Sequence, residues 1–369
     1  EKAVADGCFP HRTEDYIVLK SLAEEYHLAM AYYYLGCLLY DRRVYDESIE
    51  DYEESILRSP DFPTVHRNLA LAYYNVKKLP QRAYEEMEKA FALDETDARV
   101  YLELDQLKKR LNVAVKERWS DMEKHFDLVE SRDDLYLEYV TLLNTLGEPE
   151  KALGLIKARK FHQWEGGEGK VAAQYLTALY QLAKAAVEKE DYAEAKELLL
   201  RAVGEYPHNL GEGKLESGQE NNLYYLLGLV QEKLGEAKDA FESLTRACCG
   251  ESEPVGMMYY NDQPPEMIYY QGLAYRMLGE EEQAVRRFQK LVDYGREHIR
   301  DDVKIDYFAV SLPDLLIFEE NLNERNRKHC LFMMSLGLKG LGRIDEAEKC
   351  AEELLAMDNA HQEIRVHDL

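Results

Sequence analysis

The run Gly166-Gly167-Glu168-Gly169-Lys170 is the stretch whose residue types most invite a chemical role. Backbone N–H groups of a glycine-rich loop before a helix can surround an anion such as a phosphate. A phosphate-binding P-loop, however, needs a glycine and a hydroxyl residue where this sequence has Trp164 and Val171. The pattern therefore favours a loop that joins two helices and caps the second. Residues 211–214 repeat the order Gly-Glu-Gly-Lys, which favours one site built by both loops.

Acid–base catalysis would require two of the loop carboxylates to flank one substrate bond. The candidates are Glu165, Glu168, Glu212 and Asp262. Solvated loop charges are the more usual outcome, because a carboxylate with a shifted pKa needs a shaped, partly dry pocket. The histidines show no H-E-x-x-H spacing, which is typical of zinc sites. We predict no catalytic residue, no metal site and no cofactor.

Three connections, at residues 161–170, 208–220 and 255–265, are longer than a chain reversal needs. Loops above about 12 residues are uncommon in compact domains and are often functional. We predict that these three form one face and bind the partner. The loop residues assigned to binding are Trp164, Glu165, Glu168, Lys170, Tyr259, Tyr260, Asn261 and Asp262. Such rings and amides suit either a carbohydrate or a tyrosine-rich protein interface, and the alternative is that prolines merely stiffen a spacer.

The charge balance restricts the class of partner. The 369 residues include 46 basic and 71 acidic side chains, a net charge of −25. This field repels phosphate backbones and anionic lipid, so we predict that neither nucleic acid nor membrane is a partner. A partner with basic or apolar side chains fits better.

Cysteine spacing and hydropathy bear on the compartment. The six cysteines show no C-x-x-C pair, and no apolar run approaches the roughly 18 residues of a membrane span. We predict reduced thiols and a cytoplasmic location. The sequence does not begin with methionine, which predicts a fragment of a longer protein.

The elements that position the loops are helices, and residues 221–248 show their pattern most clearly. Apolar and small residues recur at i, i+3, i+4 and i+7 in both halves, which predicts two amphipathic helices. Gly235 ends the first, since glycine enters the left-handed cap conformation without steric cost. Gly228 and Ala240, twelve residues apart, allow two antiparallel helices to approach closely.

The same order returns at residues 268–291, where Gly272, Gly279, Ala284 and Phe288 take the corresponding places. Weaker copies occur elsewhere in the chain. This succession of aromatic, Leu-Gly, Tyr, Ala, Phe and Pro positions resembles the tetratricopeptide repeat, a helix-turn-helix of roughly 34 residues. The resemblance implies an all-α solenoid of about eight hairpins, a right-handed superhelix with long inter-repeat loops.

The repeats predict four regions along the chain. These are an N-terminal capping helix region at 1–28 with Thr13 as N-cap, hairpins at 29–160 with a degenerate repeat at 98–132, loop-rich hairpins at 161–249, and C-terminal hairpins at 250–369 with an insertion at 295–327.

In tetratricopeptide arrays the first helices of the hairpins line a concave groove. The resemblance places Tyr33, Tyr225, Tyr269 and Phe332 at equivalent positions on these helices, either exposed in the groove or packed in the core. Arg67 beside Asn68 matches a fragment of the basic and amide clamp by which known arrays bind carboxylates. We therefore count Arg67 and the four rings among the candidate partner-binding residues.

Several segments also resemble the C-terminal repeat region of large, poorly characterised bacterial proteins. They are FHQWEGGEGKV, NLGEGKLESGQEN, MYYNDQPPEMIYYQGLA and KIDYFAVSLPDLL. In that family the repeats follow a domain similar to a carbohydrate-acting β-sandwich, which implies an upstream domain here. Two functions follow. The first is a non-enzymatic scaffold that binds a protein segment or its own upstream domain through the groove and loops. The alternative is an accessory module of a carbohydrate-active protein.

We expect no specific complex with DNA or RNA at physiological salt, because the acidic field opposes the counterion release that drives such binding. An electrophoretic mobility assay with duplex DNA and single-stranded RNA checks this. A complex that weakens steeply with added salt would contradict it.

Overall fold

The computed structural model describes residues 9–164, 166–214, 219–256, 262–304 and 317–367. Within these residues the regular structure is entirely helical, without a strand, which confirms the all-α prediction. The chain divides into two compact units. Unit 1 comprises residues 1–113 with 313–319, and unit 2 comprises residues 114–312 with 320–369.

Unit 1 contains two hairpins flanked by single helices. Its helices are α1 (Thr13–Tyr26), α2 (Ala29–Asp41), α3 (Tyr45–Arg58), α4 (Pro63–Asn75), α5 (Pro80–Leu93) and α6 (Ala98–Arg110). Helix α2 pairs with α3, α4 pairs with α5, and α6 packs on α5. Both hairpins lie within the region 29–160 in which the sequence predicts hairpins.

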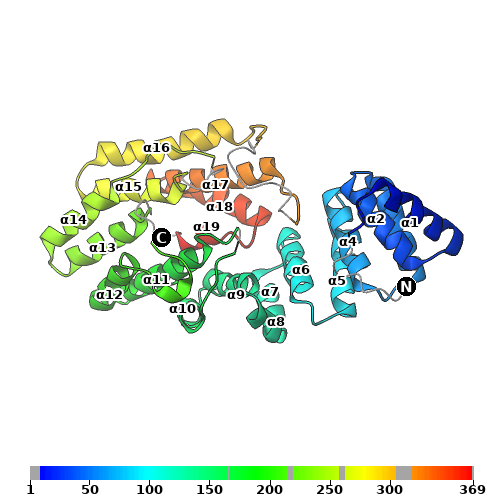
Figure 1. Ribbon diagram of the computed structural model, residues 1–369. Coiled ribbons are helices and arrows are strands. Elements are labelled where there is room, and N and C mark those ends of the chain that lie inside the picture. Colours follow the sequence, from blue (N-terminus) through cyan, green and yellow to red (C-terminus); the bar gives the residue numbers. More distant parts are fainter. Residues whose placement is uncertain (1–8, 165, 215–218, 257–261, 305–316, 368–369) are drawn as a thin grey trace. The chain divides into compact units, whose positions relative to one another are not determined.

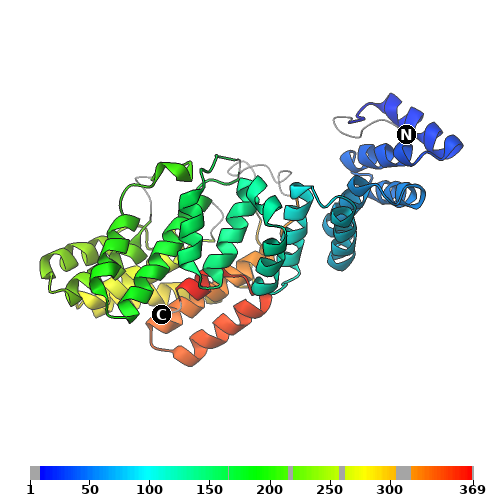
Figure 2. The ribbon, with the colours of Figure 1, turned by 90° about the horizontal axis from the view of Figure 1, so that it is seen from below.

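The described part of unit 2 contains five hairpins. Its helices are α7 (Val115–Lys124), α8 (Phe126–Ser131), α9 (Asp133–Thr145), α10 (Pro149–Ala158), α11 (Lys170–Glu188), α12 (Tyr192–Ala202), the 3-10 helix η1 (His208–Leu210), α13 (Asn221–Lys233), α14 (Ala237–Ala247), α15 (Pro265–Met277), α16 (Glu281–His298), α17 (Leu322–Gly340), α18 (Ile344–Met357) and α19 (Gln362–Val366). The hairpins are α9/α10, α11/α12, α13/α14, α15/α16 and α17/α18, and each packs on the next along the chain (Figures 1 and 2).

The two helices of each hairpin cross next to a small residue on the second helix. These residues are Ser48, Ala83, Ala152, Ala195, Ala240, Ala284 and Ala347, and all are buried. At the crossing of α13 with α14, a Cβ added to Gly228 would lie 2.7 Å from Cγ of Leu244 and 3.3 Å from the carbonyl oxygen of Ala240. The predicted close approach of these helices is therefore confirmed, and it leaves no room for a larger side chain.

The turns inside the hairpins require a left-handed residue. Gly235 and Gly279 supply it at φ +77° and +82°, as the sequence predicts. Where glycine is absent, Arg43, Lys78 and Glu190 adopt φ between 54° and 60°. The hairpin geometry is thus strong enough to hold a non-glycine residue in a conformation that L side chains rarely adopt.

The main difference from the predicted organisation lies in the degenerate repeat at 98–132. Along the sequence, the boundary between the two units falls between Val113 and Ala114. Helix α6 therefore belongs to unit 1, while α7 and α8 belong to unit 2. This stretch lacks the pair of small residues that allows two helices to cross closely. The chain consequently changes from one unit to the other there.

Two helix ends also differ from the prediction. Thr13 is the first helical residue of α1 and not its N-cap, because the Asp15 carboxylate accepts the backbone N–H groups of His11 and Arg12, at 3.0 and 2.9 Å. Helix α16 continues through Gly295 to His298, and α17 begins at Leu322, so the insertion is shorter than predicted. Gly295 lies inside this helix, and glycine is needed there because an added Cβ would lie 2.8 Å from the Cys330 carbonyl oxygen.

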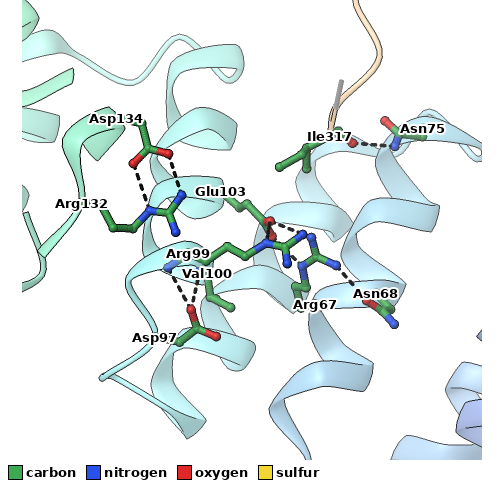
Figure 3. A network of polar contacts seen from close by, with 10 residues as sticks. All are labelled: Arg67, Asn68, Asn75, Asp97, Arg99, Val100, Glu103, Arg132, Asp134 and Ile317. Carbon is green, nitrogen blue, oxygen red and sulfur yellow. Dashed lines mark hydrogen bonds and ion pairs between the residues drawn. The ribbon is translucent and has the colours of Figure 1, made fainter. Parts of the chain in front are cut away.

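A strap formed by residues 317–319 completes unit 1. The Asn75 side-chain amide donates to the Ile317 carbonyl oxygen at 2.9 Å (Figure 3). The side-chain oxygen of Asn75 accepts the Glu319 N–H at 2.9 Å. The buried Phe318 ring packs edge-on against Tyr74, at a centroid separation of 5.1 Å. The strap is thus fixed by both backbone and side-chain contacts, although 242 residues separate Ile317 from Asn75.

We expect Gly272→Ala to destabilise unit 2 by about 1–3 kcal/mol, because the buried Phe288 ring lies between Gly272 and Gly340 and cannot move from an added methyl group. Gly279→Ala should cost about 1 kcal/mol through φ alone, since no atom lies within 4 Å of its added Cβ. Urea unfolding measures both losses.

A double-mutant cycle with Phe288→Leu separates the two causes. The smaller side chain should offset part of the loss from Gly272→Ala and none of the loss from Gly279→Ala. If the losses of stability from the single variants simply added in both cycles, the Phe288 ring would not be the group that clashes with the methyl group added at Gly272.

Candidate functional site

The two glycine-rich loops predicted to share a site lie together in unit 2. The Phe161 N–H donates to the Asn209 carbonyl oxygen at 2.8 Å, and the Asn209 amide donates to the carbonyl oxygens of Ile156 and Arg159 at 2.8 and 2.9 Å. Gly211 lies so close that a Cβ there would be 2.8 Å from the Phe161 carbonyl oxygen. Loop 161–170 is therefore bound along the start of the 208–220 connection.

Glu212 joins these loops to helix α11. Its carboxylate accepts the N–H of Gly169 at 2.7 Å and the N–H of Ala172 at 2.9 Å. The first amides of a helix carry partial positive charge and favour an anion. Here the anion is the chain's own side chain, so a phosphate would have to displace it. The Glu of the second Gly-Glu-Gly-Lys run thus caps the helix that begins at the first run.

A pocket of about 460 Å³ opens between the two loops. We call it the paired-loop pocket, and it is lined by His162, Gln163, Trp164, Gly167, Glu168, Val171, Leu210, Gly211 and Glu212. The Trp164 indole lies directly against Gly167, where an added Cβ would overlap the ring. Glycine at this position leaves room for the ring beside the loop backbone, and the ring is part of the pocket lining.

Asp133, the first residue of α9, fixes the beginning of the first loop. Its carboxylate accepts from Arg159 Nε at 2.6 Å and from the His162 N–H at 2.8 Å, and His162 Nδ1 lies 3.1 Å away. Burial alone would raise the pKa of Asp133, but these hydrogen bonds and the charge of Arg159 outweigh it and lower the pKa. The charged carboxylate therefore ties the pocket to α9.

The predicted loop residues differ in their placement. Trp164 and Glu168 line the paired-loop pocket, whereas Lys170 is exposed at the start of α11 and is not among the lining residues. Glu165, Tyr259, Tyr260 and Asn261 lie outside the described residues. Asp262 is half-buried in the third connection. The described beginning of that connection contacts α17, where His329 Nε2 donates to the Val255 carbonyl oxygen at 2.8 Å. One face shared by all three loops stays a prediction.

Three of the four rings predicted at the groove are core residues. The exposed fractions of Tyr33, Tyr269 and Phe332 are 7%, 3% and 3%, which contradicts groove exposure, and only Tyr225 is half-exposed. Tyr33, for example, packs edge-on against Phe62 at a centroid separation of 4.9 Å. Tyr269 packs against Phe288 of its own hairpin, and Phe332 packs against His361.

Arg67 is committed to an internal ion pair. Its Nε and Nη2 donate to the two carboxylate oxygens of the fully buried Glu103 on α6, at 2.7 and 2.6 Å (Figure 3). Arg99 Nε donates to the same carboxylate at 3.1 Å. Breaking a buried pair leaves an uncompensated charge, which is strongly unfavourable. Arg67 therefore joins α4 to α6 and is not a free clamp for a partner carboxylate.

Sequence reasoning missed the roles of His162, Gln163 and Leu210 in the pocket. They precede each Gly-Glu-Gly-Lys run, so the repeated motif was a usable signal, but their contact depends on the packing of α9, η1 and α11. Among the described residues no cluster of three metal-ligating side chains occurs. The five cysteines within that part form no disulfide. No described helix is long and apolar enough to cross a membrane.

Comparison with known proteins identifies the hairpins. Sequence models of the tetratricopeptide repeat match residues 33–98 and 180–254, and another matches residues 266–294. These segments are tetratricopeptide repeats, as the sequence pattern predicts. They include α3 to α5, α12 and the hairpin α13/α14 in full, and they cover parts of α2, α11, α15 and α16.

Several solved structures are similar to this chain. MamA is 17% identical, over 71% of this chain and 95% of MamA, with a TM-score of 0.20. The Naa15/Naa10 complex bound to HypK-THB is 10% identical over 92% of this chain, with a TM-score of 0.40. The Cut9–Hcn1 hetero-tetramer of the APC/C is 14% identical over 75%, with a TM-score of 0.24. This chain spans 60% and 42% of the matched chains in the latter two.

We expect Glu212→Ala to destabilise unit 2 by about 1–2 kcal/mol, because two amides at the start of α11 lose their acceptor. Glu168→Ala is the matched control, since it removes an exposed carboxylate from the same pocket. Urea unfolding followed by circular dichroism gives both values. Equal losses in the two variants would refute the capping role.

Proposed function

We propose that this chain is a protein-interaction scaffold whose paired-loop pocket receives an arginine or lysine side chain of a partner protein. The observation that supports this most directly is the combination of an indole wall with a carboxylate, Trp164 with Glu168, in one pocket of about 460 Å³. A cation is attracted to the face of an indole ring and to a carboxylate at the same time.

The charges near the pocket favour a basic ligand. Glu212 adds a second carboxylate to the lining. The whole chain carries a net charge of −25, which attracts basic segments and raises the rate at which they associate. The opposing surface of a partner should therefore be basic, with apolar residues beside the inserted side chain.

The proposal includes no catalytic role for this part of the chain. Glu212 caps α11, and Asp133 is held by Arg159 and His162, so these two carboxylates near the loops have structural tasks. Lys170 and Asp262 stay candidates for partner binding, as do Glu165, Tyr259, Tyr260 and Asn261, which lie outside the described residues. The partner segment belongs to another protein or to an upstream domain of the same protein.

A carbohydrate is the second candidate ligand, in keeping with the bacterial family that the loops resemble. The indole of Trp164 could stack on the apolar face of a sugar, while the Gln163 amide and Glu168 carboxylate bind its hydroxyl groups. The two candidates differ in one respect that an experiment can measure. A basic ligand loses affinity when its charge is removed, whereas a neutral sugar needs no charge.

Trp164 can report on binding directly. The chain has two tryptophans, so a Trp119→Phe variant leaves Trp164 as the single indole fluorophore. We expect a short arginine-containing peptide to change its fluorescence, and the citrulline version of that peptide to bind roughly 5–30-fold more weakly, in line with about 1–2 kcal/mol for the lost charge.

Two variants and one ligand complete the test. Glu168→Gln should weaken the arginine peptide, while Glu188→Gln, an exposed carboxylate at the far end of α11, should not. A neutral oligosaccharide serves as the competing ligand. Binding of the oligosaccharide, with no difference between the arginine and citrulline peptides, would favour the carbohydrate function and overturn ours.

A further inference from the structure

Residues 358–367, which we call the inner segment, lie against the first helices of the unit 2 hairpins. The segment follows α18 and includes the five-residue helix α19. In both views it lies among α9, α11 and α17 (Figures 1 and 2). Its described contacts with other hairpins are to α9, α11, α15 and α17, all of them first helices. The inner segment thus occupies the surface that these helices form together.

The beginning of α19 is bound through an amide network. Gln174 Nε2 on α11 donates to Gln362 Oε1 at 2.8 Å. Gln362 Nε2 in turn lies 3.2 Å from the Thr141 carbonyl oxygen and 3.2 Å from Thr145 Oγ1, both on α9. The Gln362 side chain is 8% exposed, so both ends of its amide are satisfied by the receiving helices. The receiving helices thus bind the Gln362 amide through both its donor and its acceptor, as a binding site specific for an amide side chain would.

The end of the segment is bound through its backbone and through an imidazole. Lys184 Nζ on α11 donates to the Val366 carbonyl oxygen at 2.8 Å. A hydrogen bond of 3.1 Å joins Tyr270 Oη on α15 to His367 Nδ1, and Tyr180 Oη lies 2.6 Å from Tyr270 Oη. Burial, with the nearby charge of Lys184, lowers the pKa of His367 to about 3, so the surface receives a neutral imidazole.

The side chains of α19 alternate between the surface and solvent. Gln362, Ile364 and Val366 are buried, while Glu363 and Arg365 are exposed. A five-residue helix is far too short to be stable in water by itself, because the first turn costs more order than its hydrogen bonds return. Its conformation therefore depends on the surface that holds it, as for a bound peptide.

We propose that the first helices of unit 2 form a peptide-binding surface, for which the inner segment is an internal ligand that competes with a partner segment of the same chemistry. That partner segment carries an amide side chain, then β-branched apolar residues two and four positions later, and then a neutral histidine. The proposal goes beyond the paired-loop pocket and is independent of it. A tethered segment acts at an effective concentration on the order of 1 mM. A partner segment must therefore bind the surface more tightly than the inner segment does, or bind after the inner segment has left the surface.

The test uses a fluorescent peptide of residues 358–367 and the whole chain in two forms. In the Ile364→Asp chain a charge replaces a buried apolar side chain, so the inner segment should leave the surface. Fluorescence anisotropy should show that this chain binds the peptide at least about tenfold more tightly than the parent chain, whose surface is filled. Arg365→Gln is the matched control in the same helix and should behave as the parent, because Arg365 is exposed.

Two further changes test the recognition itself. A peptide with aspartate in place of its isoleucine should not bind, and Gln174→Ala placed in the Ile364→Asp chain should weaken the normal peptide. Val366→Thr is a second, milder way to release the segment if Ile364→Asp disturbs folding. If neither released chain binds the peptide more tightly than the parent, while both melt at lower temperature, the inner segment is a fixed part of the core and the proposal is wrong.

Discussion

The close crossing of two helices at a small residue is the contact on which the hairpins depend. Ala or Ser occupies the crossing on every second helix, and at α13/α14 the neighbouring carbonyl oxygen is 3.3 Å from where a Cβ of Gly228 would lie. Buried rings fill the space around the crossings, with Tyr33 packed against Phe62 at the start of the next hairpin and Tyr269 against Phe288 of its own hairpin. In a repeat protein each unit contacts only its neighbours, so stability is a sum of such local terms. Where the small pair is missing, at residues 98–132, the chain divides into its two units.

Local features of the fold were predictable because they depend on residues close in sequence. The small residues and the turn glycines Gly235 and Gly279 identify the hairpins without knowledge of anything distant. The burial of Tyr33 or Phe332 was not predictable in this way, because Tyr33 packs against Phe62 at the start of the next hairpin and Phe332 packs against His361, which follows the last hairpin. For the candidate site, the pairing of the two loops was predictable from the sequence, but the capping contact of Glu212 was not. The repeated Gly-Glu-Gly-Lys pairs the loops, but nothing in the motif shows that Glu212 accepts from amides 40 and 43 residues away.

Several features that resemble binding sites in the sequence are satisfied by the chain itself. The amides at the start of α11 hold Glu212, Arg67 holds Glu103, and the inner surface of unit 2 holds residues 358–367. Buried polar groups must find partners, and a folded chain usually supplies them internally. Trp164 and Glu168 differ from these, since they line a pocket that remains accessible. A sequence motif indicates which polar or charged groups can bind a ligand. Packing determines whether another part of the same chain already binds them.

The strap at residues 317–319 has a consequence for the order in which the protein is made. The continuous stretch of unit 1 ends at Val113. Its Asn75 amide and Tyr74 ring, however, contact Ile317 and Phe318, which are synthesised much later. A ribosome that adds about 5–20 residues per second synthesises the strap roughly 10–40 s after residue 113. During that interval the exposed edge of α4 is open to chaperones. Premature termination between residue 113 and the strap would therefore leave unit 1 incomplete, although every described helix of unit 1 had already been translated.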